Sequence, residues 1–355
     1  MNTQLEHIAT EPAAAIARLA PQDWWWSAGM LVGLLAASFF ALSVGPLQLP
    51  LSDIWASFTG SADQLTRTTV LEIRAPRILL ALAVGAALGI SGAVVQTLFR
   101  NPLAEPGLLG ISSGAALAAV ACIVLLPATL SSIATLPAAA FLGAALASML
   151  VVKIAQLSML EPRVAQLLAG IAINALAASG IGVLSYLADD LALRSLTFWM
   201  FGSLGAASWS TVLFCLPLIL ATPVLAPLQA HRLDVLQLDE SDAVYLGVDT
   251  RRLRRLLLVL VVASVGAAVA LAGIIGFVGL VVPHLLRLAG VRDHRRLLPC
   301  SAVLGASLLL IADTVARTAL APGELPVGMI TALLGSPFFL LLMMRDRNGL
   351  ATPRC

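Results

Sequence analysis

Three arginines lie at the ends of long apolar segments, where they are placed to bind a charged partner. Arg74 and Arg77 precede one such segment, and Arg317 follows another. Their guanidinium groups suit two-point binding of carboxylates. The same side chains can instead extend along an apolar surface to reach lipid headgroups. The sequence leaves both interpretations open: contact with lipid, or a pair of basic notches for acidic residues of an external partner.

Two further polar residues lie inside apolar segments. Asp313 precedes Arg317 by four residues, a spacing that places both on one helix face and predicts an intrahelical ion pair. Asn174 can hydrogen-bond a neighbouring helix or line a path through the protein. A charge at the bilayer centre costs on the order of 3 kcal/mol on insertion scales, so polar groups there often have a function. An ion-coupled secondary transporter using Asp313 or Asn174 is therefore the rival hypothesis from a different functional class.

The sequence lacks the motifs of common catalytic and metal sites. It contains no G-x-x-x-x-G-K-[ST] motif, and its one lysine, Lys153, ends an apolar segment. It has no H-E-x-x-H motif, and its four histidines and four cysteines show no metal-ligand spacing. No basic run with interleaved aromatic residues suggests nucleic acid as a partner. We expect a chain that is not an enzyme and holds no metal.

Composition indicates which elements position these residues. Hydrophobic residues make up 59% of the 355 residues and charged residues 11%, whereas a soluble domain carries roughly 25% charged residues. So few charges cannot cover a soluble protein of this size, and lipid must solvate most of the surface. The charge-free stretches predict an all-α polytopic membrane protein with about ten transmembrane helices. The expected spans are residues 24–44, 78–99, two within 107–152, 164–188, 209–228, two within 256–286, 299–320 and 325–344.

The distribution of Lys and Arg predicts the orientation. With the N-terminus in the cytoplasm, most of the 21 basic residues face inward, as the positive-inside rule requires. The predicted organisation is a cytoplasmic tail (1–22), a ten-helix membrane domain (23–345) with an inner loop (229–252), and a second cytoplasmic tail (346–355). The basic residues expected outside are Arg67, Arg74, Arg77, Arg194 and Arg317.

A polar segment interrupts the helices between the second and third spans. The hinge, residues 101–110, contains Asn101, Pro102, Glu105, Pro106 and Gly107. Two prolines in so short a stretch require non-helical backbone, which membrane proteins tolerate where it borders a cavity or is buried in protein. A broken helix at a substrate site is the first interpretation. The charge distribution favours a second one, an inner-face elbow near a gate, with Glu105 close to a helix start at Gly107.

The inner loop carries the signals of a short amphipathic helix. Ser241 is expected to cap a helix over residues 242–246, which Gly247 ends. Such a helix can lie on the lipid surface or fit a groove in a cytoplasmic partner.

Several motifs in the same order resemble the FecCD-type permeases, the membrane subunits of ATP-binding-cassette importers for iron-siderophores, haem and cobalamin. The resemblance extends from about Trp24 to Arg345. The motifs are RAPR at 74–77, GISGAVVQ at 89–96, NPLAEPG at 101–107, GFVGLVVPHLLR at 276–287, DTVAR at 313–317 and ELPVG at 324–328.

This resemblance implies a type II importer permease fold in the bacterial inner membrane, surrounded by lipid. It implies a homodimer with the pathway between the subunits, two ATPase subunits in the cytoplasm, and a periplasmic substrate-binding protein outside. By position, Arg74, Arg77 and Arg317 match arginines that receive acidic residues of the binding protein. The residues that fall in the loop matching the ATPase-coupling helices are Asp239, Glu240, Ala243, Leu246 and Gly247.

The expected substrate follows from two further motifs. LAGIAINAL at 168–176 and LTFWMFGSLG at 196–205 most resemble the haem-importing branch, with ferric siderophore and then cobalamin as alternatives. No His or Tyr pair in the spans is placed to ligate haem iron, so haem is expected as transported cargo and not as a cofactor. The implied mechanism is alternating access, with ATP consumed by the partner subunits.

Overall fold

The computed structural model describes residues 24–127, 134–238, 240–321 and 323–346. Within these ranges every regular element is helical. The principal helices are α2 (Trp24–Ser43), α3 (Leu51–Thr59), α4 (Gln64–Thr68), α5 (Ala75–Phe99), α6 (Ile111–Leu125), α7 (Thr135–Leu157), α8 (Pro162–Leu187), α9 (Asp190–Met200), α10 (Trp209–Ile219), α11 (Ala221–Leu225), α12 (Ala230–Val235), α13 (Glu240–Tyr245), α14 (Thr250–Ala272), α15 (Val278–Leu288), α16 (His294–Thr318) and α17 (Val327–Asp346).

The apolar segments of the described chain confirm the predicted fold class. Six helical segments are long and apolar enough to cross a membrane, and four shorter apolar helices accompany them. The long segments are Gln64–Phe99, Thr135–Leu157, Pro162–Leu187, Trp209–Val235, Thr250–Ala272 and His294–Thr318. The shorter ones are Gly29–Ser43, Ile111–Leu125, Val278–Leu288 and Val327–Leu340. Each segment coincides with one of the ten expected spans.

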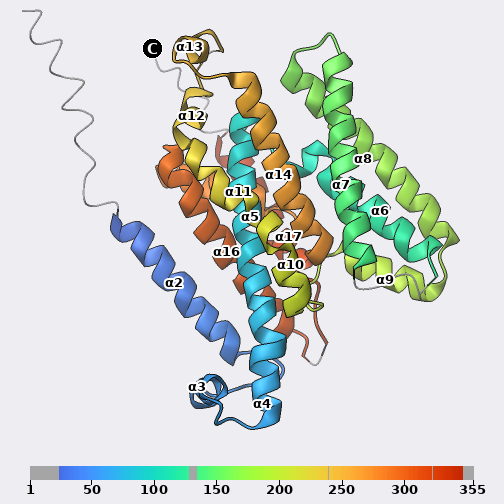
Figure 1. Ribbon diagram of the computed structural model, residues 1–355, viewed down its shortest axis with the longest axis vertical. Coiled ribbons are helices and arrows are strands. Elements are labelled where there is room, and N and C mark those ends of the chain that lie inside the picture. Colours follow the sequence, from blue (N-terminus) through green and yellow to red (C-terminus); the bar gives the residue numbers. More distant parts are fainter. Residues whose placement is uncertain (1–23, 128–133, 239, 322, 347–355) are drawn as a thin grey trace, which may run out of the picture.

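Helix α5 forms the centre of the bundle. It packs most extensively against α16 and also contacts α14 and α15 (Figure 1). Helices α6 to α9 form a group on one side of this bundle. Helices α12 and α13 lie at one end, whereas α3 and α4 lie at the opposite end (Figure 1). The predicted inner loop and the predicted docking arginines of α5 are therefore at opposite ends of the molecule.

Glycines allow α5 to approach its neighbours closely. A Cβ atom on Gly85 would lie 2.4 Å from the carbonyl oxygen of Gly305 in α16, and one on Gly92 would lie 1.8 Å from that of Gly279 in α15. Membrane helices lack a hydrophobic driving force for association, so close contacts between small residues contribute much of their packing energy. Both contacts involve α5, which explains why nearly all of this helix is buried.

Two predicted span boundaries are wrong. The second span does not begin at residue 78, because a continuous helix already starts at Gln64 and passes through a π-helical turn, Thr69–Arg74. Arg74 and Arg77, whose charges suggested a span end, are instead buried within this helix. The sixth span continues to Val235 with interruptions at α10, α11 and α12, a region that contains three prolines. Helix α9 was not expected. Its N-cap Asp189 accepts a hydrogen bond from the Ala192 amide at 2.7 Å.

The short inner-loop helix exists, with different bounds. Helix α13 begins at Glu240, so Ser241 lies inside the helix and is not its cap. The predicted C-terminal signal is confirmed: Gly247 has φ 75°, and the Val248 amide donates to the Ala243 carbonyl at 3.0 Å. Asp239 lies outside the described residues, as do the predicted tails apart from residue 346.

Candidate functional site

The predicted docking arginines lie together in a charge cluster, which consists of Arg74, Arg77, Asp313, Arg317 and Glu324. We call it the outer charge cluster, because the distribution of Lys and Arg predicts that this end faces outward. Arg77 Nη2 lies 2.9 Å from Asp313 Oδ1, and its Nη1 donates to both oxygens of Glu324 at 2.9 and 3.1 Å. Arg317 Nε lies 3.2 Å from Asp313 Oδ2, which confirms the predicted ion pair within α16. Residues from α5, α16 and the loop before α17 thus meet at one end of the bundle.

Two of these arginines also terminate a neighbouring helix. Arg74 donates to the carbonyls of Leu42, Ser43 and Leu47, and Arg317 Nη2 donates to the Ala41 carbonyl at 3.1 Å. The last carbonyls of a helix lack partners inside it, and cations stabilise this end of the helix dipole. Arg74 and Arg317 therefore cap the C-terminus of α2, a role that their spacing in the sequence did not indicate.

The outer charge cluster is closed within one chain. Arg74, Arg77 and Arg317 are 3%, 6% and 3% exposed, so none of them extends to the lipid headgroups. Three guanidinium groups face two carboxylates here, which leaves an excess positive charge. The Glu324 side chain is 40% exposed, and the Asp313 side chain is fully buried. A partner's carboxylate could reach Arg77 most readily by replacing Glu324.

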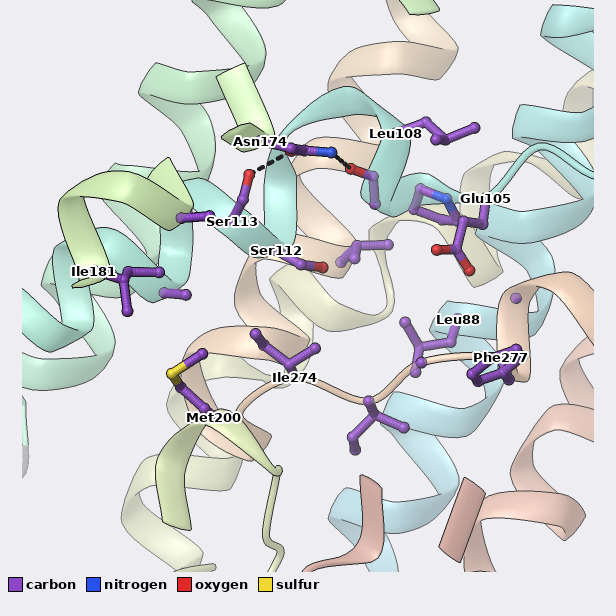
Figure 2. Close-up of a pocket in the computed structure, with 18 residues that line it drawn as sticks. Leu88, Glu105, Leu108, Ser112, Ser113, Asn174, Ile181, Met200, Ile274 and Phe277 are labelled. Atoms are coloured by element: carbon purple, nitrogen blue, oxygen red, sulfur yellow. Dashed lines mark hydrogen bonds between the residues drawn. The ribbon is translucent and has the colours of Figure 1, made fainter. Parts of the chain in front are cut away.

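A cavity of about 340 Å³ lies between the two regions of broken helix. Figure 2 shows Asn174 of α8, Ser112 and Ser113 of α6 and Glu105 of the hinge around it. Most of its other lining is apolar: Leu88, Leu108, Ile181, Met200, Ile274 and Phe277. The lining residues include no His or Tyr.

The hinge is non-helical, as predicted, and its first turns are fixed by local hydrogen bonds. Arg100 ends α5 with φ 47°, and Asn101 Oδ1 then accepts a hydrogen bond from the Leu103 amide at 2.9 Å. A 3₁₀ turn, Pro106–Leu109, and a left-handed Gly110 precede α6. The expected helix start at Gly107 is thus four residues too early, because Pro106 and Gly107 belong to the 3₁₀ turn.

Asn174 connects the hinge to α6. Its side-chain oxygen accepts a hydrogen bond from Ser113 Oγ at 2.5 Å, and its amide nitrogen contacts the Gly107 carbonyl at 3.4 Å (Figure 2). The predicted hydrogen bond of Asn174 to a neighbouring helix is therefore confirmed, and the same residue lines the cavity. Glu105, Pro106 and Gly107 of the hinge line the same cavity. The hinge residues and the pathway candidate Asn174, which the sequence analysis treated separately, are therefore adjacent in the structure.

The second break lies between α14 and α15, inside the run 256–286 in which the sequence predicted two spans. Gly273 has φ 69°, and a Cβ atom there would lie 2.2 Å from the Trp199 carbonyl oxygen. Phe277, the N-cap of α15, has φ 67°, a conformation that is unfavourable for an aromatic residue. The first turns of α15 and of α6 both border the cavity, so the positive ends of two helix dipoles lie beside it.

The charge of the cavity lining depends on one side chain. Of the described lining residues, Glu105 alone is ionisable, and its carboxylate and the Ser112 hydroxyl are directed toward the same space (Figure 2). Burial raises the pKa of Glu105 above its ordinary value, because desolvation disfavours the charged form. The cavity therefore carries less negative charge than an exposed glutamate would give it.

The predicted coupling residues that the structure describes, Glu240, Ala243, Leu246 and Gly247, lie at the end opposite to the outer charge cluster. Ala243 is buried, whereas Leu246 is 60% exposed and Gly247 is also exposed. Leu246, directly after α13, therefore presents an apolar side chain where the chain leaves the bundle. Sequence reasoning did not single out Glu324 or Ser113, whose partners lie far away in sequence.

Residues 33–345 match the FecCD transport family. The hemin transport system permease HmuU of Yersinia pestis is 47% identical over 90% of this chain and 95% of its own length. The vitamin B12 import permease BtuC of Vibrio cholerae is 42% identical over 92% of this chain and 96% of its own. An inward-facing metal-chelate type ABC transporter superposes with a TM-score of 0.80 at 33% identity, covering 90% of this chain and 98% of that one.

The fold and these matches define a polytopic membrane permease of an ATP-binding-cassette importer. The chain belongs to the FecCD transport family, whose permeases pair with ATPase and substrate-binding subunits. The ion-coupled alternative loses its main candidate, because Asp313 is fully buried and paired with Arg77 and Arg317.

Proposed function

We propose that this chain is the permease of a haem importer in the bacterial inner membrane. Two copies form a homodimer with both termini in the cytoplasm. Two ATPase subunits bind the cytoplasmic face, and a periplasmic substrate-binding protein binds the outer face. Haem is the cargo, and the chain itself holds no cofactor.

The lining of the cavity is the observation that carries the choice of haem. Haem is a flat apolar ring with two carboxylate groups. The cavity offers apolar walls together with two helix N-termini and the Ser112 hydroxyl, groups that favour negative charge. The raised pKa of Glu105 reduces repulsion of those carboxylates. The hemin permease of Yersinia pestis is also more similar to this chain than the vitamin B12 permease of Vibrio cholerae.

The cavity lining suits passage of haem and not its retention. Haem iron is held in proteins by side chains such as His, Tyr, Cys or Met. Met200 is the one residue of these types in the lining. Weak contacts allow the cargo to leave after each cycle.

The homodimer is supported by α8. Only 17% of an 18-residue apolar stretch of this helix is buried within one chain, the lowest share among the six long segments of the described chain. The same helix contributes Asn174, Ala178 and Ile181 to the cavity. A second copy placed against α8 would cover apolar surface beside the cavity, where a shared pathway is expected.

Docking of the substrate-binding protein is assigned to Arg74, Arg77 and Arg317. The excess positive charge of the outer charge cluster supports an acidic partner, and Arg77 is the member whose present partner, Glu324, is accessible. The proposed ATPase contact is made by Asp239, Glu240, Ala243, Leu246 and Gly247. ATP-driven closure of the ATPases moves this loop, and the hinge residues Asn101, Pro102, Glu105, Pro106 and Gly107 transmit the motion to the pathway that Asn174 lines.

Stimulation of ATP hydrolysis tests this proposal. The complex of permease and ATPase is reconstituted, and hydrolysis is measured with the substrate-binding protein loaded with hemin or left empty. Hemin loading is expected to increase the rate, and Arg77→Glu should abolish the increase. Stimulation by cobalamin or a ferric siderophore in place of hemin would reassign the cargo. Unchanged stimulation of Arg77→Glu would remove the docking assignment.

A further inference from the structure

A buried histidine connects three helices at the cytoplasmic end of the bundle. His294, the first residue of α16, is fully buried. Its Nδ1 lies 2.5 Å from Asp234 Oδ1 of α12, and its Nε2 lies 2.7 Å from Thr97 Oγ1 of α5. The Asp234 carboxylate also accepts the His294 amide at 3.2 Å. The two side-chain contacts of the ring span 60 and 197 positions in the sequence, so α5 and α12 are joined here through His294.

The chemistry of the ring gives the direction of both contacts. A carboxylate can only accept, so Nδ1 of His294 donates to Asp234. The neutral imidazole carries one N–H, so its Nε2 accepts the hydroxyl hydrogen of Thr97, which can otherwise go to the Ala93 carbonyl at 2.9 Å. Each end of the bridge therefore depends on the other through one rigid group.

A second contact follows the same route. The guanidinium of Arg100, at the C-terminus of α5, donates to the Leu236 carbonyl at 3.1 Å and to the Leu238 carbonyl. These carbonyls lie between α12 and α13. The last turn of α5 is therefore attached to the segment that leads into α13, at both Thr97 and Arg100.

The last turn of α5 also leads directly into the hinge. The Asn101 amide donates to the Gln96 carbonyl at 3.0 Å, and Glu105 of the hinge lines the cavity. Gln96 in addition donates to the Leu280 carbonyl of α15 at 3.2 Å. Movement of this turn would thus reach both broken-helix regions that border the cavity.

We infer that Asp234, His294 and Thr97 form a relay that transmits displacement of α13 to the hinge, with His294 as its positioning residue. The inference rests on the proposed function, because it requires the ATPase to bind at α13. It assigns a role to a histidine that neither the docking surface nor the cavity uses. Coupling between the two sites should disappear when the ring no longer bridges Asp234 and Thr97.

Hydrogen exchange at both ends of the relay tests it without any cargo. The permease–ATPase complex is compared with and without a non-hydrolysable ATP analogue, and deuterium uptake is followed at α13 and at the hinge. In the native chain both segments should respond to the nucleotide. Thr97→Val, which keeps the buried shape, and His294→Gln should reduce the hinge response about five-fold or more while α13 still responds. Thr331→Val is the matched control, a buried threonine whose hydroxyl bonds only within its own helix, at the Gly328 carbonyl.

A double variant separates transmission from a general loss of stability. Because Thr97 and Asp234 act through one ring, Thr97→Val combined with His294→Gln should reduce the hinge response no further than either change alone. Additive losses, or a hinge response that persists in both single variants, would overturn the relay. Failure of the ATPase to bind the native chain, or of α13 to respond, would instead contradict the proposed function.

Discussion

Arg77 holds Glu324 through a single guanidinium nitrogen that donates to both carboxylate oxygens, at 2.9 and 3.1 Å. The two residues are 247 positions apart, and Glu324 comes from the loop before α17. On its other side Arg77 binds the buried Asp313. One partner of Arg77 is thus fixed in the core and the other is exchangeable, which gives the outer charge cluster both a structural and a binding role.

Removing the charge of Glu324 should strengthen docking. Glu324→Gln leaves Arg77 with one competing carboxylate fewer, and exposed ion pairs are worth about 0.2–1 kcal/mol, so affinity for the substrate-binding protein should rise roughly 2–5-fold. Affinity is measured by titrating the substrate-binding protein onto the immobilised complex. Glu161→Gln, which removes the charge of a 53% exposed side chain paired with Arg163, serves as the control. Weaker docking by Glu324→Gln would show that Glu324 supports the docking surface and does not compete for it.

Removing the charge of Asp313 should destabilise the chain strongly. Asp313→Asn leaves the buried guanidinium groups of Arg77 and Arg317 without their common carboxylate, at a cost of about 3–5 kcal/mol. Asp249→Asn is the matched control, because its pair with Arg252 is exposed and should contribute about 0.3–0.5 kcal/mol. Thermal unfolding in detergent compares the two variants. Equal shifts in the transition would exclude a structural role for the buried pair.

Glu105 should make stability depend on pH in an unusual direction. Its pKa in the folded protein is raised above 4.5, so the folded state binds a proton that the unfolded state has already released. Stability should therefore fall as pH rises from 4.5 to the raised value, and Glu105→Gln should remove this decrease. The unfolding midpoint across that range measures the effect. A stability that rises through this range equally in both chains would contradict the burial of Glu105.

Asp63 should show the opposite sign. It caps α4 by accepting the Thr66 amide at 3.2 Å, and hydrogen bonding to Thr66, first from its side chain and then from its amide, lowers the pKa of Asp63 below 3.8. Its contribution is present above pH 3.8 and is lost as pH falls through the lowered value. Asp63→Asn should weaken this acid sensitivity, measured by the same midpoint. If the unfolding midpoint falls equally with decreasing pH in Asp63→Asn and in the native chain, the cap contributes nothing to stability.

The close packing of α5 predicts that a Gly→Ala substitution destabilises the protein at one helical glycine and stabilises it at another. Gly92→Ala would place a Cβ atom 1.8 Å from the Gly279 carbonyl oxygen, so α5 and α15 must separate at a cost of about 1–3 kcal/mol or more. Gly182→Ala in α8 meets no atom within 4 Å and should stabilise its helix by roughly 0.5–1 kcal/mol. The thermal midpoints of the two variants should move in opposite directions. Movement in the same direction would refute the close α5–α15 contact.

Local sequence patterns predicted those structural features that depend on residues close together in the sequence. The spacing of Asp313 and Arg317 predicted their ion pair, the run 256–286 predicted two spans, and Gly247 marked the end of the inner-loop helix. The charge-free stretches gave ten apolar segments because lipid requires continuous hydrophobic length. The start of α4 at Gln64 could not be read in this way, because Arg74 and Arg77 suggested a boundary when they are in fact buried by distant partners.

The site depends on contacts that sequence spacing does not encode. Arg77 meets Asp313 across 236 positions, and Asn174 meets Gly107 across 67. The capping of α2 by Arg74 and the presence of Glu105 and Asn174 in one cavity both require the packed bundle. Family resemblance indicated which residues matter, and only the packing shows which of them act together.

ATP-dependent uptake into proteoliposomes tests the central claim most directly. The permease is reconstituted with its ATPase, and accumulation of hemin, cobalamin and a ferric siderophore is measured with their substrate-binding proteins present. The account predicts that hemin accumulates with ATP, not with ADP, and that an uncoupler has no effect. Accumulation of cobalamin or the siderophore in place of hemin, or hemin uptake driven by an ion gradient without the ATPase, would contradict it.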